Sequence, residues 1–432
     1  MRRPFRIIAL ALFAAALAAA PSGATRRFFD DDPIAREPET QDAAGVAEWE
    51  IDLTIDLATN LFGRPGDGTP GVRARNINTI DEVPDSSWFT NRILARPVTA
   101  DDIARGPLTG NGPAPGKWSI VSPKQSGFAP GFTVLDSRGD RWFVSFDAAG
   151  YPEAATGAIA VANKIFWALG YWQVENYLVS IKTDDLFIGD KATFTPASGR
   201  KRRMRPDDIK AVLRRAHRSA DGSYRAIAAR AVPGRPVGGF RYYGTRPDDP
   251  NDIVPHEHRR ELRGARVFGA WLNHDDSRGV NSLDFLTTEG GRNFVKHYMF
   301  DFGSIMGSGT TFAQRHRAGN EYILEWKPGW LTLATLGIYT RPWLHYNYPD
   351  VPASVGRFEG DSFDPETWKP EYPNPAFRNM RADDAFWAAR IVSRFGDDAI
   401  RAIVAKARYS DPQASDYIAA TLIKRRDKVM QT

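Results

Sequence analysis

The stretch His274-Asp275-Asp276-Ser277-Arg278-Gly279-Val280-Asn281 is followed, after a short and largely hydrophobic interval, by Asp301-Phe302-Gly303. The two segments fit H-x-D-x-x-x-x-N and D-F-G in that order. An Asp on a loop can accept the proton of a hydroxyl group, and the oxygen atoms of an Asn and a second Asp suit magnesium. Each segment alone is weak evidence. Together they predict a site for chemistry on phosphate groups.

The segments around these motifs predict an α+β protein. Alternating apolar residues and turn signals indicate strands, and apolar residues at helical spacing indicate a helix. In order, we expect strands at 118–121, 132–135 and 141–146, a helix from Pro152 to Leu169, and a strand at 177–182. A second helix from Pro255 should run to His274, and residues 280–286 and 293–300 should form a hairpin. The first motif then lies on a loop after a helix, and the second follows a strand.

The N-terminus has the pattern of an export signal. Arg2, Arg3 and Arg6 precede an apolar run of 14 residues, 7–20, and Ser22-Gly23-Ala24 offers small residues for cleavage. We therefore expect a signal peptide at 1–24 and a periplasmic or extracellular protein without an integral membrane segment after cleavage. The expected divisions are a leader and irregular N-terminal arm at 25–115, a small lobe at 116–190 and a large lobe at 191–432.

Composition excludes several classes of site. The chain has 432 residues and no cysteine, which rules out disulfides, thiolate metal sites and a cysteine nucleophile. The formal net charge of +5 is small for this length. The local basic clusters at 200–205 and 424–428 are expected to be solvated surface, and no nucleic-acid partner is predicted.

In its motif residues the chain resembles the atypical kinase-like superfamily, which includes HipA-type kinases, phosphatidylinositol kinases, spore-coat kinases and secreted Golgi kinases. The resemblance covers about residues 116 to 310. Over nearly its whole length the chain also resembles a family of exported bacterial proteins, through residues 255–262, 271–276 and 297–303. The first resemblance implies a two-lobed protein-kinase-like fold, with a small antiparallel β lobe plus one helix and a larger, mainly helical lobe. It also implies ATP and Mg²⁺ as cofactors and phosphotransfer to a hydroxyl of a protein or small molecule.

Each candidate site residue has an expected role. Asp276 is the candidate catalytic base, and His274 is placed in the catalytic loop, where it is expected to support the loop against the D-F-G segment. Asn281 and Asp301 are the candidate metal ligands. Lys124 lies in a loop between two strands, where Gly127 and Gly131 allow close approach of phosphates. Glu153 is the nearby helix acid that could pair with a lysine.

Three alternatives remain open. Kinase-like small lobes carry a lysine on the third strand, but this chain has Ser145 there, so it is either a kinase that uses Lys124 instead or a catalytically inactive binding module of the cell envelope. The aromatic residues from Trp326 to Tyr372 are expected to pack in the core, although they could line a groove of a carbohydrate-binding envelope protein. A zinc site from His256, His258 and His274 lacks the usual spacing.

Overall fold

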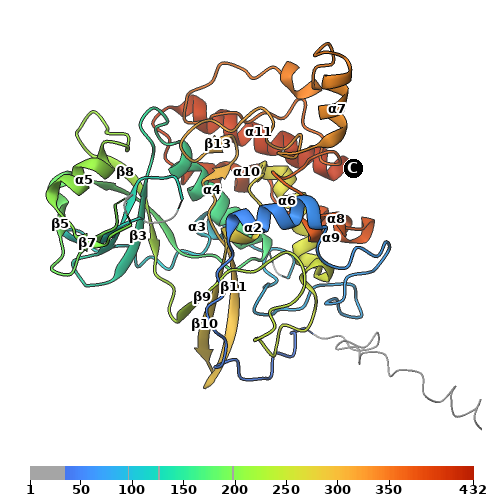
Figure 1. Ribbon diagram of the computed structural model, residues 1–432, viewed down its shortest axis with the longest axis horizontal. Helices are drawn as coiled ribbons and strands as arrows, with labels where there is room; N and C mark the ends of the chain where they lie inside the picture. The colour runs from blue at the N-terminus through green and yellow to red at the C-terminus, as the bar shows by residue number, and fades with distance from the viewer. Residues whose placement is uncertain (1–34, 96, 125–126, 197–198) are drawn as a thin grey trace, which may run out of the picture.

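The computed structural model describes residues 35–95, 97–124, 127–196 and 199–432. The predicted signal peptide at 1–24 lies outside these residues. The fold is α+β, as predicted, with a mixed six-stranded sheet, a three-stranded sheet and a largely helical C-terminal part. Figure 1 shows the six-stranded sheet on one side of the molecule and helices α6, α10 and α11 on the other, with α4 between them. No helix among the described residues is long and apolar enough to cross a membrane.

The six-stranded sheet is built mainly from neighbouring segments of the chain. Its order is β4-β8-β3-β2-β1-β5, in which β1 to β3 form an antiparallel meander and β5 pairs with β1 in parallel. The strands are β1 (Trp118–Pro123), β2 (Gly131–Leu135), β3 (Arg141–Phe146), β4 (Asn176–Ile181), β5 (Leu186–Ile188) and β8 (Tyr224–Arg230). Helix α5 (Pro206–Leu213) packs on one face through a separate hydrophobic cluster that includes Trp142, Val144 and Ile209. The predicted boundary at residue 190 therefore falls inside this unit, which extends to β8.

Helix α4 (Ala154–Leu169) connects the sheet to the rest of the molecule. It begins two residues later than predicted, because Glu153 has a left-handed φ of 61° and serves as the N-cap. It ends at Gly170, whose φ of 118° suits the residue without a Cβ. Nearly all of its side chains are buried, and they belong to the main core together with α6 and the C-terminal helices.

The second half of the chain holds the main core. The three-stranded sheet has the order β11-β10-β9, and most helices of this half pack on one another. Its strands and the helices are β9 (Arg235–Gly238), β10 (Ser282–Glu289), β11 (Arg292–Met299), α6 (Arg260–Leu272), α7 (Trp326–Ala334), α8 (Pro375–Arg378), α9 (Ala382–Val392), α10 (Asp397–Ala405) and α11 (Pro412–Gln431). From Ala382 onward, apolar residues at helical spacing indicate roughly three amphipathic helices, and the structure forms α9, α10 and α11 there.

The N-terminal arm packs on the second half of the chain. It contains α2 (Leu53–Ala58) and α3 (Ala100–Arg105), and the Trp88 indole stacks on the His297 ring with the centroids 3.5 Å apart. The Asn76 amide donates to Glu261 Oε2 (2.5 Å), and Arg259 donates to Glu37 Oε2 (2.8 Å). These contacts are buried, so the arm is an integral part of the fold rather than a detached leader.

Candidate active site

The loop at 274–281, here called the catalytic loop after the role expected of Asp276, begins where α6 ends. Asn273, with a left-handed φ of 51°, is the C-cap of α6, and its side chain accepts a hydrogen bond from Trp368 Nε1 (2.9 Å). The turn at Asn273 directs the chain back, so the His274 amide donates to the carbonyl of Gly269 (2.8 Å). Asn is one of the few residues that tolerate this backbone region. The loop from His274 to Asn281 is therefore fixed by a buried helix end.

The β10–β11 hairpin brings both motifs to one place. Ser282 pairs with Met299, and the Phe300 amide donates to the carbonyl of Asn281 (3.2 Å), so Asn281 and Asp301 lie at the same end of the hairpin. Asn281 Nδ2 also donates to the main-chain carbonyl of Asp276 (2.8 Å). Asp276, Asn281 and Asp301 are thus brought together, as the two motifs predict.

The D-F-G segment is anchored by its phenylalanine. The Phe302 ring is buried and stacks on Phe166 of α4, with the centroids 4.5 Å apart, and lies 5.5 Å from the His274 ring. Asp301 has a left-handed φ of 57°, which is uncommon for a residue with a Cβ and is often found at functional sites. The packing of Phe302 therefore fixes the position of the neighbouring Asp301.

The His274 ring lies against the D-F-G segment, 5.5 Å from the Phe302 ring. Burial lowers the pKa of His274 to about 3, so the ring is neutral at physiological pH. Ser277 Oγ lies 2.9 Å from Nδ1 and donates to the His274 carbonyl (2.8 Å). Nε2 is buried without a partner among the described residues. The neutral, enclosed imidazole thus packs on Phe166 and Phe302, an arrangement compatible with the expected support of the loop.

The two neighbouring acids of the loop have raised pKa values. Burial, with the charges of Asp276 and Glu371, raises the pKa of Asp275 to about 7. Burial also raises the pKa of Asp276 to about 6, against the lowering effect of Arg278, and the nearby charge of Asp301 adds to the rise. Perturbed carboxylates of this kind cluster at functional sites. Asp276 has a pKa suited to a base that is ionised at neutral pH but still binds a proton readily.

Two residues of the site were missed by the sequence reasoning. Arg278 forms an ion pair with Asp276 (2.5 Å) and also contacts Glu371 (2.7 Å), whose amide donates to the carbonyl of Asp275 (2.7 Å). Arg278 stands inside the quoted motif and is the only cation in it, so its charge was a visible signal. Glu371 is 93 residues beyond Arg278, and nothing local indicated it.

The donor set of Asn281 and Asp301 fits a magnesium ion. Among the described residues, the Asp301 carboxylate accepts one long hydrogen bond, from the Gly303 amide (3.4 Å), and Asn281 uses its amide nitrogen in the bond to Asp276. Oxygen atoms from one Asp and one Asn are hard ligands, and Mg²⁺ in such sites takes the rest of its shell from water and phosphate. In the described part of the chain, no group of three or more His, Cys, Asp or Glu side chains is arranged to hold a metal.

The residues predicted to hold the nucleotide are less clearly assembled. Lys124 is half-buried, and its Nζ lies close to Gly127, 3.4 Å from the point that a Cβ would occupy there. A Cβ on Gly131 would meet the carbonyl oxygen of Val144 at 2.1 Å, so close strand packing by itself explains this glycine. Glu153 contacts Arg225 (3.4 Å) and accepts from the Ser410 amide (2.8 Å). Within the described ranges, no contact joins Lys124 to Glu153, Asp276 or Asp301.

Ser145 faces the α4 side of the sheet. It pairs with Ile227 of β8, and directly opposed residues of an antiparallel pair share a face. Ile227 belongs to the core that contains α4, whereas its neighbours Ala226 and Ala228 face α5. Helix α4 itself carries no Asp or Glu with which a lysine at position 145 could pair.

The histidines considered for zinc each have separate partners. His256 Nε2 lies 2.7 Å from Asp252 Oδ2, and His258 Nε2 lies 2.9 Å from Asp67 Oδ2. His258 Nδ1 accepts from Arg263 NH2 (2.6 Å). The segment at 255–262, one of those that resemble the exported family, thus forms a buried polar network between α6 and the arm.

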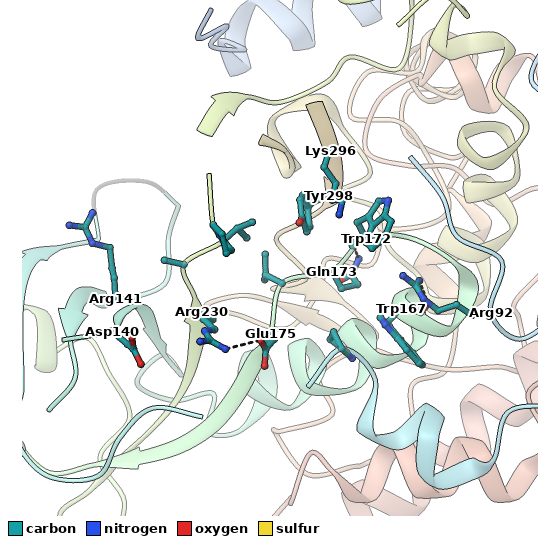
Figure 2. Close-up of a pocket in the computed structure, with 15 residues that line it drawn as sticks. Arg92, Asp140, Arg141, Trp167, Trp172, Gln173, Glu175, Arg230, Lys296 and Tyr298 are labelled. Atoms are coloured by element: carbon teal, nitrogen blue, oxygen red, sulfur yellow. Dashed lines mark hydrogen bonds and ion pairs between the residues drawn. The ribbon is translucent and has the colours of Figure 1, made fainter. Parts of the chain in front are cut away.

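A separate cavity of about 540 Å³ lies away from the motifs (Figure 2). It opens between the ends of β3 and β8, the α4–β4 connection and strand β11 of the hairpin. Its lining residues include Arg92, Trp167, Trp172, Glu175, Arg230, Lys296 and Tyr298. None of the predicted site residues lines it. Two of its basic side chains are already engaged, since Arg230 pairs with Glu175 (3.1 Å) and Lys296 lies 4.0 Å from the centre of the Trp172 ring.

Comparisons with known proteins give little further information. No family model and no curated protein matches the chain. Among solved structures, the chain is similar to the crystal structure of a Helicobacter pylori proinflammatory kinase, CtkA, at 12% sequence identity. The match covers 74% of this chain and 98% of that chain, with a TM-score of 0.38. A likeness at this level establishes neither a family nor an activity for this chain.

Proposed function

We propose that this chain has a two-lobed, kinase-like architecture and transfers a phosphoryl group from ATP, with Mg²⁺, to a hydroxyl of a protein or small molecule. The observation that carries the proposal is the convergence of Asp276, Asn281 and Asp301 at one end of the β10–β11 hairpin. The antiparallel sheet and α4 would form the small lobe, and the helical second half the large one. The expected export signal would place this activity outside the cytoplasm.

Each residue would have a defined role. Asp276 would orient the acceptor hydroxyl and take its proton, for which its raised pKa is suitable. Asn281 and Asp301 would bind the magnesium ion, which neutralises charge on the phosphates. Arg278, which is held beside Asp276 by Glu371, would supply positive charge for phosphate oxygens. Lys124 would provide a phosphate contact from the β1–β2 loop.

A catalytically inactive nucleotide-binding module is the second candidate. Ser145 occupies the strand position where kinase-like proteins carry a lysine, and α4 has no acid to pair with one. Asp276 is also ion-paired with Arg278, which would have to give up this contact when a substrate enters. Both observations argue against phosphoryl transfer but not against nucleotide binding.

Thermal unfolding with ATP and Mg²⁺ tests binding. A ligand that binds the folded state raises the melting temperature, by an amount that grows with the ratio of ligand concentration to Kd. We expect a rise with ATP and Mg²⁺ that Asp301→Ala reduces to the level seen with ATP alone. Asp207→Ala, which removes a carboxylate that is 90% exposed on α5, is the matched control and should retain the rise. If millimolar ATP and Mg²⁺ cause no rise in the parent protein, the proposal is wrong.

Release or transfer of the γ-phosphate separates the two candidates. A kinase consumes ATP in the presence of its acceptor or slowly with water, and Asp276→Asn should lower this rate by roughly 10²–10⁴-fold while leaving the thermal shift in place. Binding without any turnover above that of Asp276→Asn would identify the inactive module.

A further inference from the structure

Residues 322–348 form an excursion from the helical half of the molecule, here called the α7 projection. Figure 1 shows α7 at the outer edge of the molecule, with both connections returning to the body. Helix α7 has nine residues, none of them buried. At 1.5 Å per residue it is about 14 Å long, much shorter than the roughly 30 Å of a bilayer core.

The exposed surface of the projection is strongly apolar. The fractions exposed are 62% for both Trp326 and Trp330, 63% for Leu333, 93% for Leu336 and 85% for Ile338. Contiguous apolar surface of this kind marks a site of interaction. Among the side chains of α7, Trp326, Trp330 and Leu333 are exposed, and helical spacing places them on one face of the helix. An exposed face that carries Trp and Leu is typical of a helix that lies in a membrane interface.

The projection is held in place at its base. Glu321, which is only 7% exposed, accepts two hydrogen bonds from Arg341 Nε (2.9 and 3.0 Å) and one from Trp343 Nε1 (2.9 Å). Glu325 forms an ion pair with Lys369 (2.5 Å). These contacts fix the base of the projection relative to the body of the molecule.

The charged residues of the projection indicate which kind of surface it contacts. Residues 326–349 contain no Asp or Glu, and they contain Lys327 and Arg341. Arg341 is neutralised by Glu321, and Lys327 is exposed. Aromatic side chains concentrate at membrane–water interfaces, and an exposed basic residue such as Lys327 favours anionic headgroups. A sugar-binding groove, in contrast, places polar groups beside its aromatic rings, whereas this surface exposes the aliphatic side chains of Leu333, Leu336 and Ile338.

We propose that the α7 projection is a membrane-interface anchor that inserts its tip among the lipids of an anionic bilayer surface. The helix lies within the headgroup and upper acyl region, with Trp326 and Trp330 at the interface and the Leu and Ile side chains below them. The body of the protein stays in water, tethered by one short apolar element. This inference does not depend on the proposed phosphotransfer.

A site-specific fluorescent probe tests the anchor in the full chain. Because the chain has no cysteine, Ile338→Cys provides a single attachment point for an environment-sensitive dye. With vesicles of phosphatidylethanolamine and phosphatidylglycerol, we expect a blue shift and quenching by a lipid-borne quencher. The same dye at Phe386→Cys, on α9 and 70% exposed, should show neither change. The probe reports only its own surroundings, so membrane contact through another segment cannot mimic the result.

Substitutions in the projection give the second readout. Leu333→Asp with Leu336→Asp, in the labelled Ile338→Cys protein, should weaken vesicle binding by roughly tenfold or more, whereas Ile80→Asp, at a position 69% exposed outside the projection, should not. The proposal is overturned if the Ile338 dye stays in water on these vesicles. It is also overturned if the blue shift arises with rising protein concentration without lipid, which identifies self-association, or with soluble polysaccharide in place of vesicles.

Discussion

At the residue scale, the candidate site depends on a few side chains with unusual surroundings. Asp275 lies beside Asp276 in the catalytic loop and accepts a hydrogen bond from Gln314 Nε2 (2.7 Å), but no cation pairs directly with it in the described structure. A buried carboxylate of this kind costs stability when it is ionised. This loss of stability follows from placing two acids side by side, at the position where a phosphate–magnesium group is proposed to bind.

Asp275→Asn should therefore stabilise the protein at high pH. The raised pKa of about 7 means that the folded state holds this proton between about pH 4 and pH 7, where the unfolded chain has released it. Stability from this group thus falls as the pH rises through this range, and the Asn variant escapes the loss. We expect a gain of about 1–2 kcal/mol in unfolding free energy at pH 8 that vanishes near pH 4. Urea unfolding at both pH values measures it, and a gain that is equal at both would contradict the assignment.

At the element scale, α6 is held by three arginines that are completely buried. Arg260 donates to Asp384 Oδ1 of α9 (3.0 Å), and Arg263 donates to the other oxygen of the same carboxylate (3.2 Å). Arg259 pairs with Glu37 of the arm (2.8 Å) and with Glu261 (2.7 Å). Because α6 ends at the catalytic loop, this network fixes the loop relative to both the arm and the C-terminal helices.

Removing Asp384 should be among the more damaging single changes in this element. Asp384→Asn leaves two buried guanidinium groups without their shared carboxylate, which costs about 3 kcal/mol or more of unfolding free energy. Asp207→Asn breaks an exposed pair with Lys210 (3.2 Å) and should change stability by less than about 0.5 kcal/mol. Chemical denaturation of both variants checks the difference, and similar losses would mean that the buried network contributes little.

At the scale of the whole molecule, one arginine connects the six-stranded sheet to the helical half. Arg225 of β8 donates to Thr156 Oγ1 at the start of α4 (2.8 Å). It also donates to the carbonyls of Ala407 (2.5 Å) and Arg408 (2.6 Å), directly after α10. The carbonyls at this chain turn and the sheet are thereby tied through a single guanidinium group.

Arg225→Met should loosen the coupling of the two halves. It removes hydrogen bonds from a charged donor that is largely buried, which costs about 2–3 kcal/mol and makes separate unfolding of the sheet easier. We expect a lower urea midpoint with a reduced slope or two resolved transitions. Arg230→Met, which breaks the half-exposed pair with Glu175 at the other end of β8, should keep one transition. A single transition of unchanged slope in both variants would show that other contacts hold the halves together.

The local secondary-structure elements of this protein can be predicted from its sequence. Strands β1 to β3, helix α4, the β10–β11 hairpin and the last three helices follow from periodicity and turn residues, and the hairpin alone is enough to place Asn281 beside Asp301. Contacts between distant segments were decided only by the tertiary structure. Arg278 pairs with Glu371, β8 joins the sheet beyond the predicted boundary at residue 190, and Glu153 pairs with Arg225. The sequence also does not tell which residues of the aromatic segment are buried. In the structure Trp368 and Tyr372 are buried, while Trp326 and Trp330 are exposed. Local pattern reports which side chains are apolar or charged, but burial and ion pairing depend on which distant surface the chain folds against.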